Sequence, residues 1–183
     1  MSLNTHLKPV FEILLPSFNN AEIDYWVFGG VGISAYVGKF IRKNKDIDVF
    51  VKEADFKKTI SILARVCASN NFKFISHVPQ GGRPKIDIKI NGKELLSVIP
   101  VYLVNDIIEF RFGKIVDKYS LQVIDKVERN IDGNRFYTPP NEYIKKIFLN
   151  HLVARRDKLN RPGVKTDIEA VFTPEERIKY NLY

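Results

Sequence analysis

Apolar positions recur along this chain with two different spacings, which predict a mixture of helices and strands. Spacings of three and four residues predict helices near 5–15, 31–40, 54–69, 140–156 and 165–172, with a short one after 173. Short apolar or alternating runs predict strands at 25–28, 46–52, 72–75 and 85–90, and two or more between 95 and 127. The pattern therefore indicates an α+β fold, a mixed β-sheet flanked by helices.

Turn residues separate the predicted elements and suggest two parts. Pro16 is expected to end the first helix, and Asn91-Gly92 is expected to form a hairpin turn. After about residue 135 the mixed pattern gives way to helices, the first of which opens at Pro139-Pro140. We therefore expect a core over 1–135 and a small helical C-terminal extension over 136–183 that packs on it.

Bulk composition narrows the class of protein. With 183 residues and 45% hydrophobic content, the chain can form one domain with a real core. No apolar run approaches the roughly 20 residues that a membrane span needs, and no signal-peptide pattern is present. Cys67 is the single cysteine, which excludes an internal disulfide framework. We expect a soluble cytoplasmic protein with no membrane association.

The net charge of +8 favours a polyanionic partner. A nucleotide, an RNA or a pyrophosphate leaving group would each suit it. A surface that serves solubility, or a lysine-rich composition in general, explains the charge equally well. The densest basic cluster, Arg155 to Lys158, is short and includes an acid, so by itself it is weak support for RNA binding.

Two aspartates carry the most chemical information. Asp46 and Asp48 lie two residues apart in a predicted strand, so both carboxylates project from one face. Ile47, Val49 and Val51 would fill the other face. Two neighbouring carboxylates repel each other unless a cation lies between them. The pair therefore predicts a divalent-metal site.

Two further features give this pair a context. Gly29-Gly30 ends an apolar strand just before a helix, where backbone N–H groups and the helix N-terminus favour an anion. Asp87 lies in the alternating strand 85–90, on the face opposite its isoleucines. If that strand is adjacent, Asp87 would join Asp46 and Asp48, and three carboxylates could hold two Mg²⁺ ions. Taken alone, Gly29-Gly30 has the alternative of being a plain turn, and each aspartate has the alternative of facing solvent.

The segment from Gly29 to Asp48 resembles the signature of the nucleotidyltransferase superfamily with the DNA polymerase β-like fold. That signature is a Gly-Gly or Gly-Ser turn, a helix, and Asp-x-Asp or Asp-x-Glu on the next strand. The resemblance is greatest to the small branch with aminoglycoside and lincosamide nucleotidyltransferases and toxin–antitoxin relatives. Ser34 stands where many antibiotic-modifying relatives carry an aspartate, and Thr166 splits the adjacent Lys-Asp usual in their tail, which argues against an antibiotic substrate.

The resemblance implies a Mg²⁺-dependent transfer of a nucleoside monophosphate from an NTP substrate to a hydroxyl, with release of pyrophosphate. Asp46 and Asp48 would bind Mg²⁺, and Asp87 would bind the catalytic metal and serve as base for the acceptor hydroxyl. The residues that would contact the nucleotide phosphates are Gly29, Gly30, Ser34, Arg42, Lys45 and Lys165.

Several alternatives stay open. The acceptor can be a small molecule or RNA, and a homodimer is plausible. A non-enzymatic reading keeps the fold as a nucleotide- or partner-binding module, such as one component of a toxin–antitoxin pair. His77 and His151 have no partner at metal-ligand spacing, so we assign both to the surface of a helix or loop.

Overall fold

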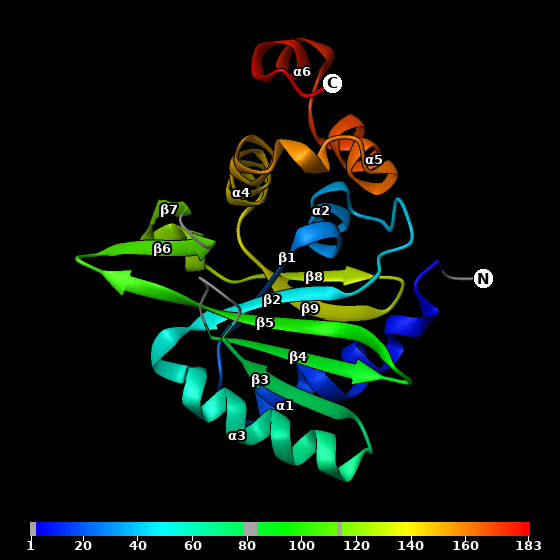
Figure 1. Ribbon diagram of the computed structural model, residues 1–183, viewed down its shortest axis with the longest axis vertical. Coiled ribbons are helices and arrows are strands. Elements are labelled where there is room, and N and C mark those ends of the chain that lie inside the picture. The colour runs from blue at the N-terminus through cyan, green and yellow to red at the C-terminus, as the bar shows by residue number, and fades with distance from the viewer. Residues whose placement is uncertain (1–2, 79–83, 113–114) are drawn as a thin grey trace.

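A computed structural model describes residues 3–78, 84–112 and 115–183 of the chain (Figure 1). Its α-helices are α1 (Leu15–Asn20), α2 (Gly29–Val37), α3 (Glu53–Ser69), α4 (Asn141–Ala154), α5 (Pro162–Val171) and α6 (Pro174–Tyr180). Its strands are β1 (Tyr25–Phe28), β2 (Ile47–Lys52), β3 (Lys73–His77), β4 (Lys85–Ile90), β5 (Lys93–Val104), β6 (Ile107–Phe112), β7 (Ile115–Ser120), β8 (Val127–Ile131) and β9 (Asn134–Thr138). The predicted α+β class with a mixed sheet is confirmed.

The central sheet has the strand order β1-β2-β5-β4-β3. Strand β5 runs parallel to β2 and antiparallel to β4, so it separates the strand that carries Asp48 from the strand that carries Asp87. Beyond this order, β6 pairs with β5 and with β7, and β8 and β9 form a hairpin of their own. Figure 1 shows α3 below the sheet, and α2, α4 and α5 above it.

Side chains along β2 point alternately to two faces of the sheet. One face is apolar, and the other, which carries Asp48, is called the functional face here. Ile47, Val49 and Val51 are fully buried in the main core, which α3 covers with an apolar stripe that includes Phe56 and Leu63. The remaining positions of β2 therefore face α2 and the C-terminal helices. The helix stripe and the strand alternation predicted from the sequence meet at this core.

The C-terminal helices are held to the core by shared apolar clusters. Ile33 of α2 is buried together with Ile144 and Leu152 of α4 and Ile168 of α5. Ile147 of α4 belongs to a second cluster with aromatic side chains of the sheet. This packing fixes α4 and α5 above α2 and places the segment between them over the functional face.

Three boundaries differ from the sequence-based expectations. The N-terminal helix does not stop at Pro16, because a π-helical turn (Val10–Leu14) leads into α1 and the proline occupies its first turn, where no N–H is needed. Asp46 immediately precedes β2 instead of lying within it. Residue 135 falls inside β9, and the helical region begins with α4 at Asn141. The division into core and extension stays a prediction.

The turn between β4 and β5 agrees with its sequence signal. Asn91 and Gly92 both have positive φ, at 51° and 76°, as a two-residue turn of this type requires.

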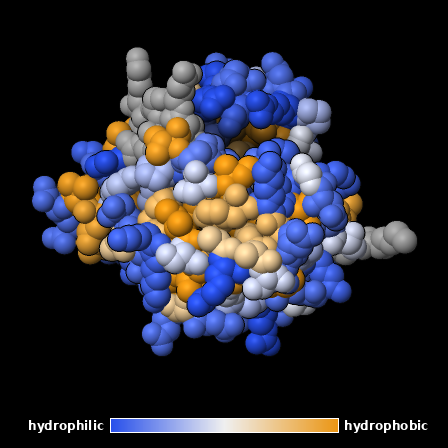
Figure 2. Space-filling model, turned by 60° about the horizontal axis from the view of Figure 1, so that its bottom comes forward, coloured by the Kyte–Doolittle hydropathy of each residue, from blue (hydrophilic) through white to orange (hydrophobic). Residues whose placement is uncertain are grey.

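On the side shown in Figure 2, hydrophilic side chains cover most of the rim and apolar ones gather nearer the centre. Within the described residues, every helix is too short or too polar to cross a lipid bilayer.

Candidate active site

The glycine turn between β1 and α2 forms a cradle with no room for side chains. Gly29 has φ +64°, and a Cβ there would overlap the carboxylate of Asp48. A Cβ at Gly30 would overlap the Arg42 guanidinium and the Asn44 amide. Asn44 is 1% exposed, and its Oδ1 has no hydrogen-bond partner among the described residues. The turn therefore brings backbone N–H groups, a carboxylate and an unsatisfied amide oxygen to one place.

The carboxylates of Asp46 and Asp48 are unfavourable neighbours when both are ionised. Burial and, next, the charge of Asp46 raise the pKa of Asp48 to about 7. Burial likewise raises the pKa of Asp46, although Lys45, 3.9 Å away, opposes this. A divalent cation between the two would remove this penalty, so the donor set suits Mg²⁺. Among the described residues, however, no group of three or more His, Cys, Asp or Glu side chains is placed to hold a metal ion.

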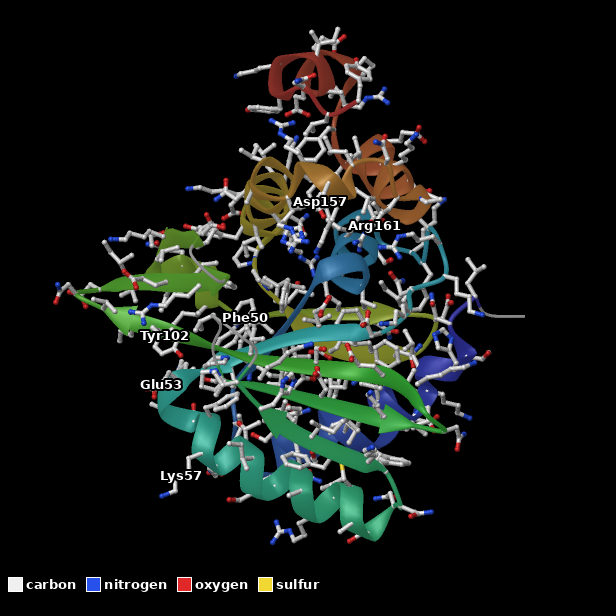
Figure 3. The ribbon with its side chains drawn as sticks, viewed as in Figure 1. Phe50, Glu53, Lys57, Tyr102, Asp157 and Arg161 are labelled. Atoms are coloured by element: carbon white, nitrogen blue, oxygen red, sulfur yellow. The ribbon has the colours of Figure 1, made fainter. Side chains whose placement is uncertain are left out.

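The glycine turn, Asp46 and Asp48 line one large cleft of about 930 Å³, within the range of small-molecule sites. The sheet side contributes Asp46, Asp48, Lys85, Glu94 and Ser97. The helical side contributes polar residues and an apolar lining that includes Ile33, Ile144, Ile147, Phe148 and Leu152. In Figure 3, Phe50 marks the sheet below, and Asp157 and Arg161 mark the helical segment above it. The cleft thus has room for a charged ligand with an apolar part.

Basic side chains of the segment between α4 and α5 form the wall opposite the carboxylates. Arg155, Lys158 and Arg161 line the cleft together with His151 of α4. Burial, then Lys158 and Arg155, lower the pKa of His151 to about 4, so the imidazole is neutral near pH 7. Burial and the two arginines also lower the pKa of Lys158, whose Nζ lies 3.0 Å from His151 Nε2. These cations repel one another, and an anion between them would relieve that repulsion.

An ion pair fastens this helical wall to the glycine turn. Arg42 donates from Nε to Asp167 Oδ1 at 2.8 Å and from Nη2 to Oδ2 at 2.6 Å. The Asp167 side chain is 4% exposed and the Arg42 side chain 22%. Arg42 also packs against Gly163, where a Cβ would lie 3.2 Å from its Nε. Arg42 therefore lines the cleft, but much of its hydrogen-bonding capacity is directed to α5, and its contact with the nucleotide phosphates stays a prediction.

Asp87 lies farther from the pair than the sequence suggested. Asp48 is in register with Ser97 on β5, and Ser97 is in register with Asp87 on β4. The Asp87 carboxylate contacts His77 Nε2 at 2.7 Å, Lys85 Nζ at 2.7 Å and Ser97 Oγ at 2.8 Å. Burial acts to raise its pKa, but these hydrogen bonds together outweigh burial and lower the pKa. Asp87 is thus an ionised, fully engaged carboxylate one strand beyond the cleft wall.

Of the remaining residues predicted to contact the nucleotide, one lines the cleft and two lie outside its lining. Lys45 lines the cleft mouth, with a side chain that is 77% exposed. Ser34 is fully buried within α2 and donates its hydroxyl hydrogen to the Gly30 carbonyl oxygen at 3.0 Å. Lys165 is exposed on α5, outside the described lining of the cleft. As nucleotide contacts, Lys45, Ser34 and Lys165 all stay predictions.

Sequence reasoning missed several residues of the cleft. Glu94 and Ser97 are not predicted from the sequence, because they join the cleft through strand pairing, and Asp167 enters only as part of the tail motif, with no role assigned to it. Of the two histidines assigned to the surface, His77 is exposed at the end of β3 and also contacts Asp87, whereas the partly buried His151 of α4 lines the cleft. The basic cluster from Arg155 to Lys158 is the sequence signal that corresponds to this wall.

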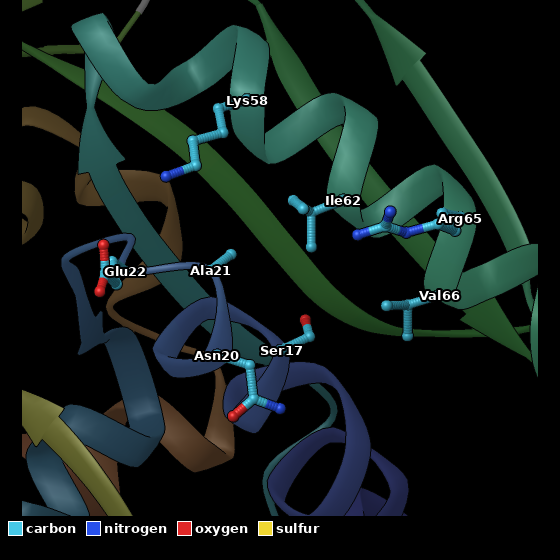
Figure 4. Close-up of a pocket in the computed structure, with 8 residues that line it drawn as sticks. All are labelled: Ser17, Asn20, Ala21, Glu22, Lys58, Ile62, Arg65 and Val66. Atoms are coloured by element: carbon cyan, nitrogen blue, oxygen red, sulfur yellow. The ribbon is translucent and has the colours of Figure 1, made fainter.

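A second, more open hollow of about 450 Å³ lies between α1 and α3 (Figure 4). Lys58 and Arg65 extend from α3, and Glu22 and Asn20 come from the end of α1 and the turn after it. Its described lining has no pair of carboxylates and no glycine turn. The chemistry is therefore concentrated in the larger cleft.

Comparisons with known proteins found a matching family model and several similar solved structures. A family model described as aminoglycoside-2''-adenylyltransferase matches residues 10–89, which include the glycine turn, Asp46, Asp48 and Asp87. No curated protein sequence matches the chain. Among solved structures, lincomycin-bound LnuA, a lincosamide antibiotic adenylyltransferase, has a TM-score of 0.57 at 20% identity, covering 89% of this chain and 96% of that one.

Two other solved structures are similar along most of their length. ANT(2'')-Ia in complex with adenylyl-2''-tobramycin has a TM-score of 0.60 at 13% identity, covering 97% of this chain and 95% of that one. A nucleotidyltransferase-like protein from Paracoccidioides brasiliensis has a TM-score of 0.54 at 19% identity, covering 93% and 76%. The fold is that of polymerase β-like nucleotidyltransferases. Together with the family model, the comparisons support the predicted resemblance to the aminoglycoside and lincosamide branch.

Proposed function

We propose that this chain is a Mg²⁺-dependent nucleotidyltransferase that moves a nucleoside monophosphate from an NTP to a hydroxyl acceptor and releases pyrophosphate. Asp46 and Asp48 would hold the cation, which neutralises phosphate charge when bound. The backbone at Gly29 and Gly30 would contact the β- and γ-phosphates. The adenylyltransferases among the similar proteins make ATP the first NTP to test.

One observation carries this proposal: the carboxylate of Asp48 lies directly against Gly29. The carboxylate that would bind the metal is thereby adjacent to the turn that would bind the anion, which suits a metal–triphosphate complex. The basic wall of Arg155, Lys158 and Arg161 faces them across the cleft and can neutralise the remaining phosphate charge. The apolar lining of α4 offers a surface for the base.

The acceptor we propose first is a small hydroxylated molecule. Two of the similar solved structures contain lincomycin or adenylyl-2''-tobramycin, and the cleft is of small-molecule size. The net charge of +8 keeps an RNA acceptor as the second possibility. Binding of RNA that stays unchanged between low and high salt would exclude phosphate-driven recognition.

A second candidate function is nucleotide binding without transfer. The position beside Asp48 on the neighbouring strand is Ser97, and the described residues hold no group of three metal-ligating side chains. A chain with this site could bind a metal–nucleotide complex and act through a partner protein. Sustained pyrophosphate release with any acceptor would rule this out.

A thermal-shift measurement with each NTP, with and without Mg²⁺, tests the nucleotide site. An NTP at 100 times its dissociation constant stabilises the native state by about 2.7 kcal/mol, which raises the melting temperature by roughly 5–10 °C here. The shift should require Mg²⁺ and should disappear in Asp48→Asn. If no NTP shifts the melting temperature of the parent protein, the nucleotide site itself is refuted.

A further inference from the structure

The position where a third carboxylate was expected holds a hydroxyl. Ser97 lies directly beside Asp48 in the parallel pairing of β2 and β5, and Asp87 is the next residue across the sheet. Since strands are about 4.8 Å apart, the Cα atoms of Asp48 and Asp87 are separated by roughly 10 Å. Because an aspartate side chain is short, Asp87 stays on the far side of Ser97 from Asp46 and Asp48.

Of the carboxylates of Asp87 on β4 and Glu94 on β5, Glu94 lines the cleft and Asp87 does not. Glu94 lies there with Lys85 and Ser97, and its side chain is 25% exposed, against 8% for Asp87. A group that receives a proton from an incoming hydroxyl must be accessible to that hydroxyl, and Glu94 meets this condition.

A shared network connects the two carboxylates. Lys85 Nζ lies 2.7 Å from Asp87 Oδ1 and 3.7 Å from Glu94 Oε1. Ser97 Oγ lies 2.8 Å from Asp87 Oδ1 and 3.3 Å from the same Glu94 oxygen. Asp87 thus anchors an ammonium and a hydroxyl group, and both of them also contact Glu94.

We infer that Glu94, and not Asp87, accepts the proton of the acceptor hydroxyl, and that Asp87 positions Glu94 through Lys85 and Ser97. This inference rests on the proposed nucleotidyl transfer. In that step the acceptor oxygen forms a bond to the α-phosphorus, and the bond from the α-phosphorus to the bridging oxygen of the β-phosphate breaks. Pyrophosphate leaves with that electron pair, and the hydroxyl proton moves to the Glu94 carboxylate.

Pyrophosphate release from Mg–ATP, with water or glycerol as the hydroxyl probe, measures the step in the full chain. Glu94→Gln should lower kcat by about 10²–10⁴-fold. The dissociation constant for Mg–ATP and the Mg²⁺ concentration at half-saturation should change less than twofold, because Glu94 binds neither. Glu128→Gln, on the exposed side of β8, is the matched control and should leave all three quantities unchanged.

Asp87→Asn separates positioning from metal binding. A positioning residue should lower kcat by about 10–100-fold, as partners of functional groups commonly do, with KM and the Mg²⁺ requirement unchanged. A marked rise in the Mg²⁺ concentration at half-saturation would make Asp87 a metal ligand and overturn its positioning role. Equal kcat in Glu94→Gln and the parent would overturn the assignment of Glu94.

The Ser97→Asp variant tests whether the native site binds Mg–ATP without catalysing transfer. The variant places a carboxylate directly beside Asp48. If the parent binds Mg–ATP but releases pyrophosphate only after this change, Glu94 is not a base in the native protein and the inference is wrong. If the parent does not bind Mg–ATP, the proposed function fails before the identity of the base is in question.

Discussion

Gly29 combines two requirements at one residue. Its φ of +64° is costly for any residue with a side chain, and the Asp48 carboxylate occupies the space that a Cβ would need. Gly38 also has positive φ, at +86°, but nothing lies within 4 Å of a Cβ built there. Substitution of Gly38 therefore tests the cost of positive φ alone. Substitution of Gly29 tests that cost together with displacement of the Asp48 carboxylate.

We expect Gly38→Ala to lower the free energy of unfolding by about 1–2 kcal/mol, the cost of the left-handed conformation, and to leave the Mg–NTP thermal shift intact. Gly29→Ala should cost at least as much and also abolish that shift, since the Asp48 carboxylate must move. Urea unfolding gives the stabilities, and thermal shift gives the binding. Retained Mg–NTP binding by Gly29→Ala would show that this contact is not part of the nucleotide site.

Asp48 destabilises the metal-free protein when it is ionised. Its pKa of about 7 in the native state, raised by burial and by Asp46, exceeds the value near 4 of an unfolded aspartate. The native state therefore binds the proton more tightly. The stability contributed by protonated Asp48 is present below about pH 4 and is lost as pH rises through about 7.

Asp48→Asn should consequently raise the melting temperature at pH 8 in a metal chelator, even though it abolishes Mg–NTP binding. We expect roughly 2–4 °C, the effect of about 1 kcal/mol in a chain of this size, and a much smaller difference at pH 5. Asp125→Asn, at an exposed aspartate, is the control and should show no such pH dependence. A lower melting temperature for Asp48→Asn at pH 8 would contradict the burial argument.

At the scale of elements, the Arg42–Asp167 pair determines how α5 lies against the glycine turn. The two residues are 125 positions apart, and Asp167 is 3% exposed. Removal of one member leaves the other charge without its partner in a poorly solvated place. The pair is therefore expected to couple the stability of α5 to that of the loop before β2.

Arg42→Gln should lower the free energy of unfolding by about 3 kcal/mol, as is typical when one partner of a buried pair is removed. The double variant with Asp167→Asn should cost less than the two single variants added together, by about 1–3 kcal/mol. Glu12→Gln breaks the exposed Lys8–Glu12 pair and should change stability by less than about 0.5 kcal/mol. Strict additivity in urea unfolding would show that the Arg42–Asp167 contact contributes nothing.

At the scale of the whole molecule, the helical C-terminal part and the sheet share their cores. Ile147 of α4 is buried in a cluster with Trp26 and Phe50, and Ile33 of α2 packs with α4 and α5. Neither part buries its apolar surface without the other. The molecule should therefore unfold in one step, with the cleft lost at the same time as the core.

Trp26 provides the probe for this expectation, because it is the single tryptophan and is 1% exposed beside α4. Its fluorescence and the far-ultraviolet circular dichroism should give the same urea midpoint. The midpoint should rise by the same amount in both signals when Mg–NTP is bound. Separate midpoints would instead indicate that the region after about residue 135 is an independent unit.

The sequence alone determined the local features of this protein. Periodic apolar positions predicted the helices and strands, because burial of one face needs only a local spacing. The glycine turn, Asp46 and Asp48 lie within twenty residues of one another, so their neighbourhood could be read from strand and helix geometry. The two-residue turn at Asn91-Gly92 was likewise local, since it depends on which residues accept positive φ.

Only the tertiary structure decided which distant residues complete the site. The insertion of β5 between β2 and β4 places Ser97 beside Asp48, moves Asp87 outward and brings Glu94 to the cleft. The packing of α4 and α5 on α2 brings Arg155, Lys158 and Asp167 over the glycine turn. Strand order and helix docking depend on the sum of many weak apolar contacts between segments far apart in sequence. No single motif records that sum. The local half of the site was therefore predictable, whereas the basic cluster of the opposite wall could be read from the sequence without its position over the glycine turn.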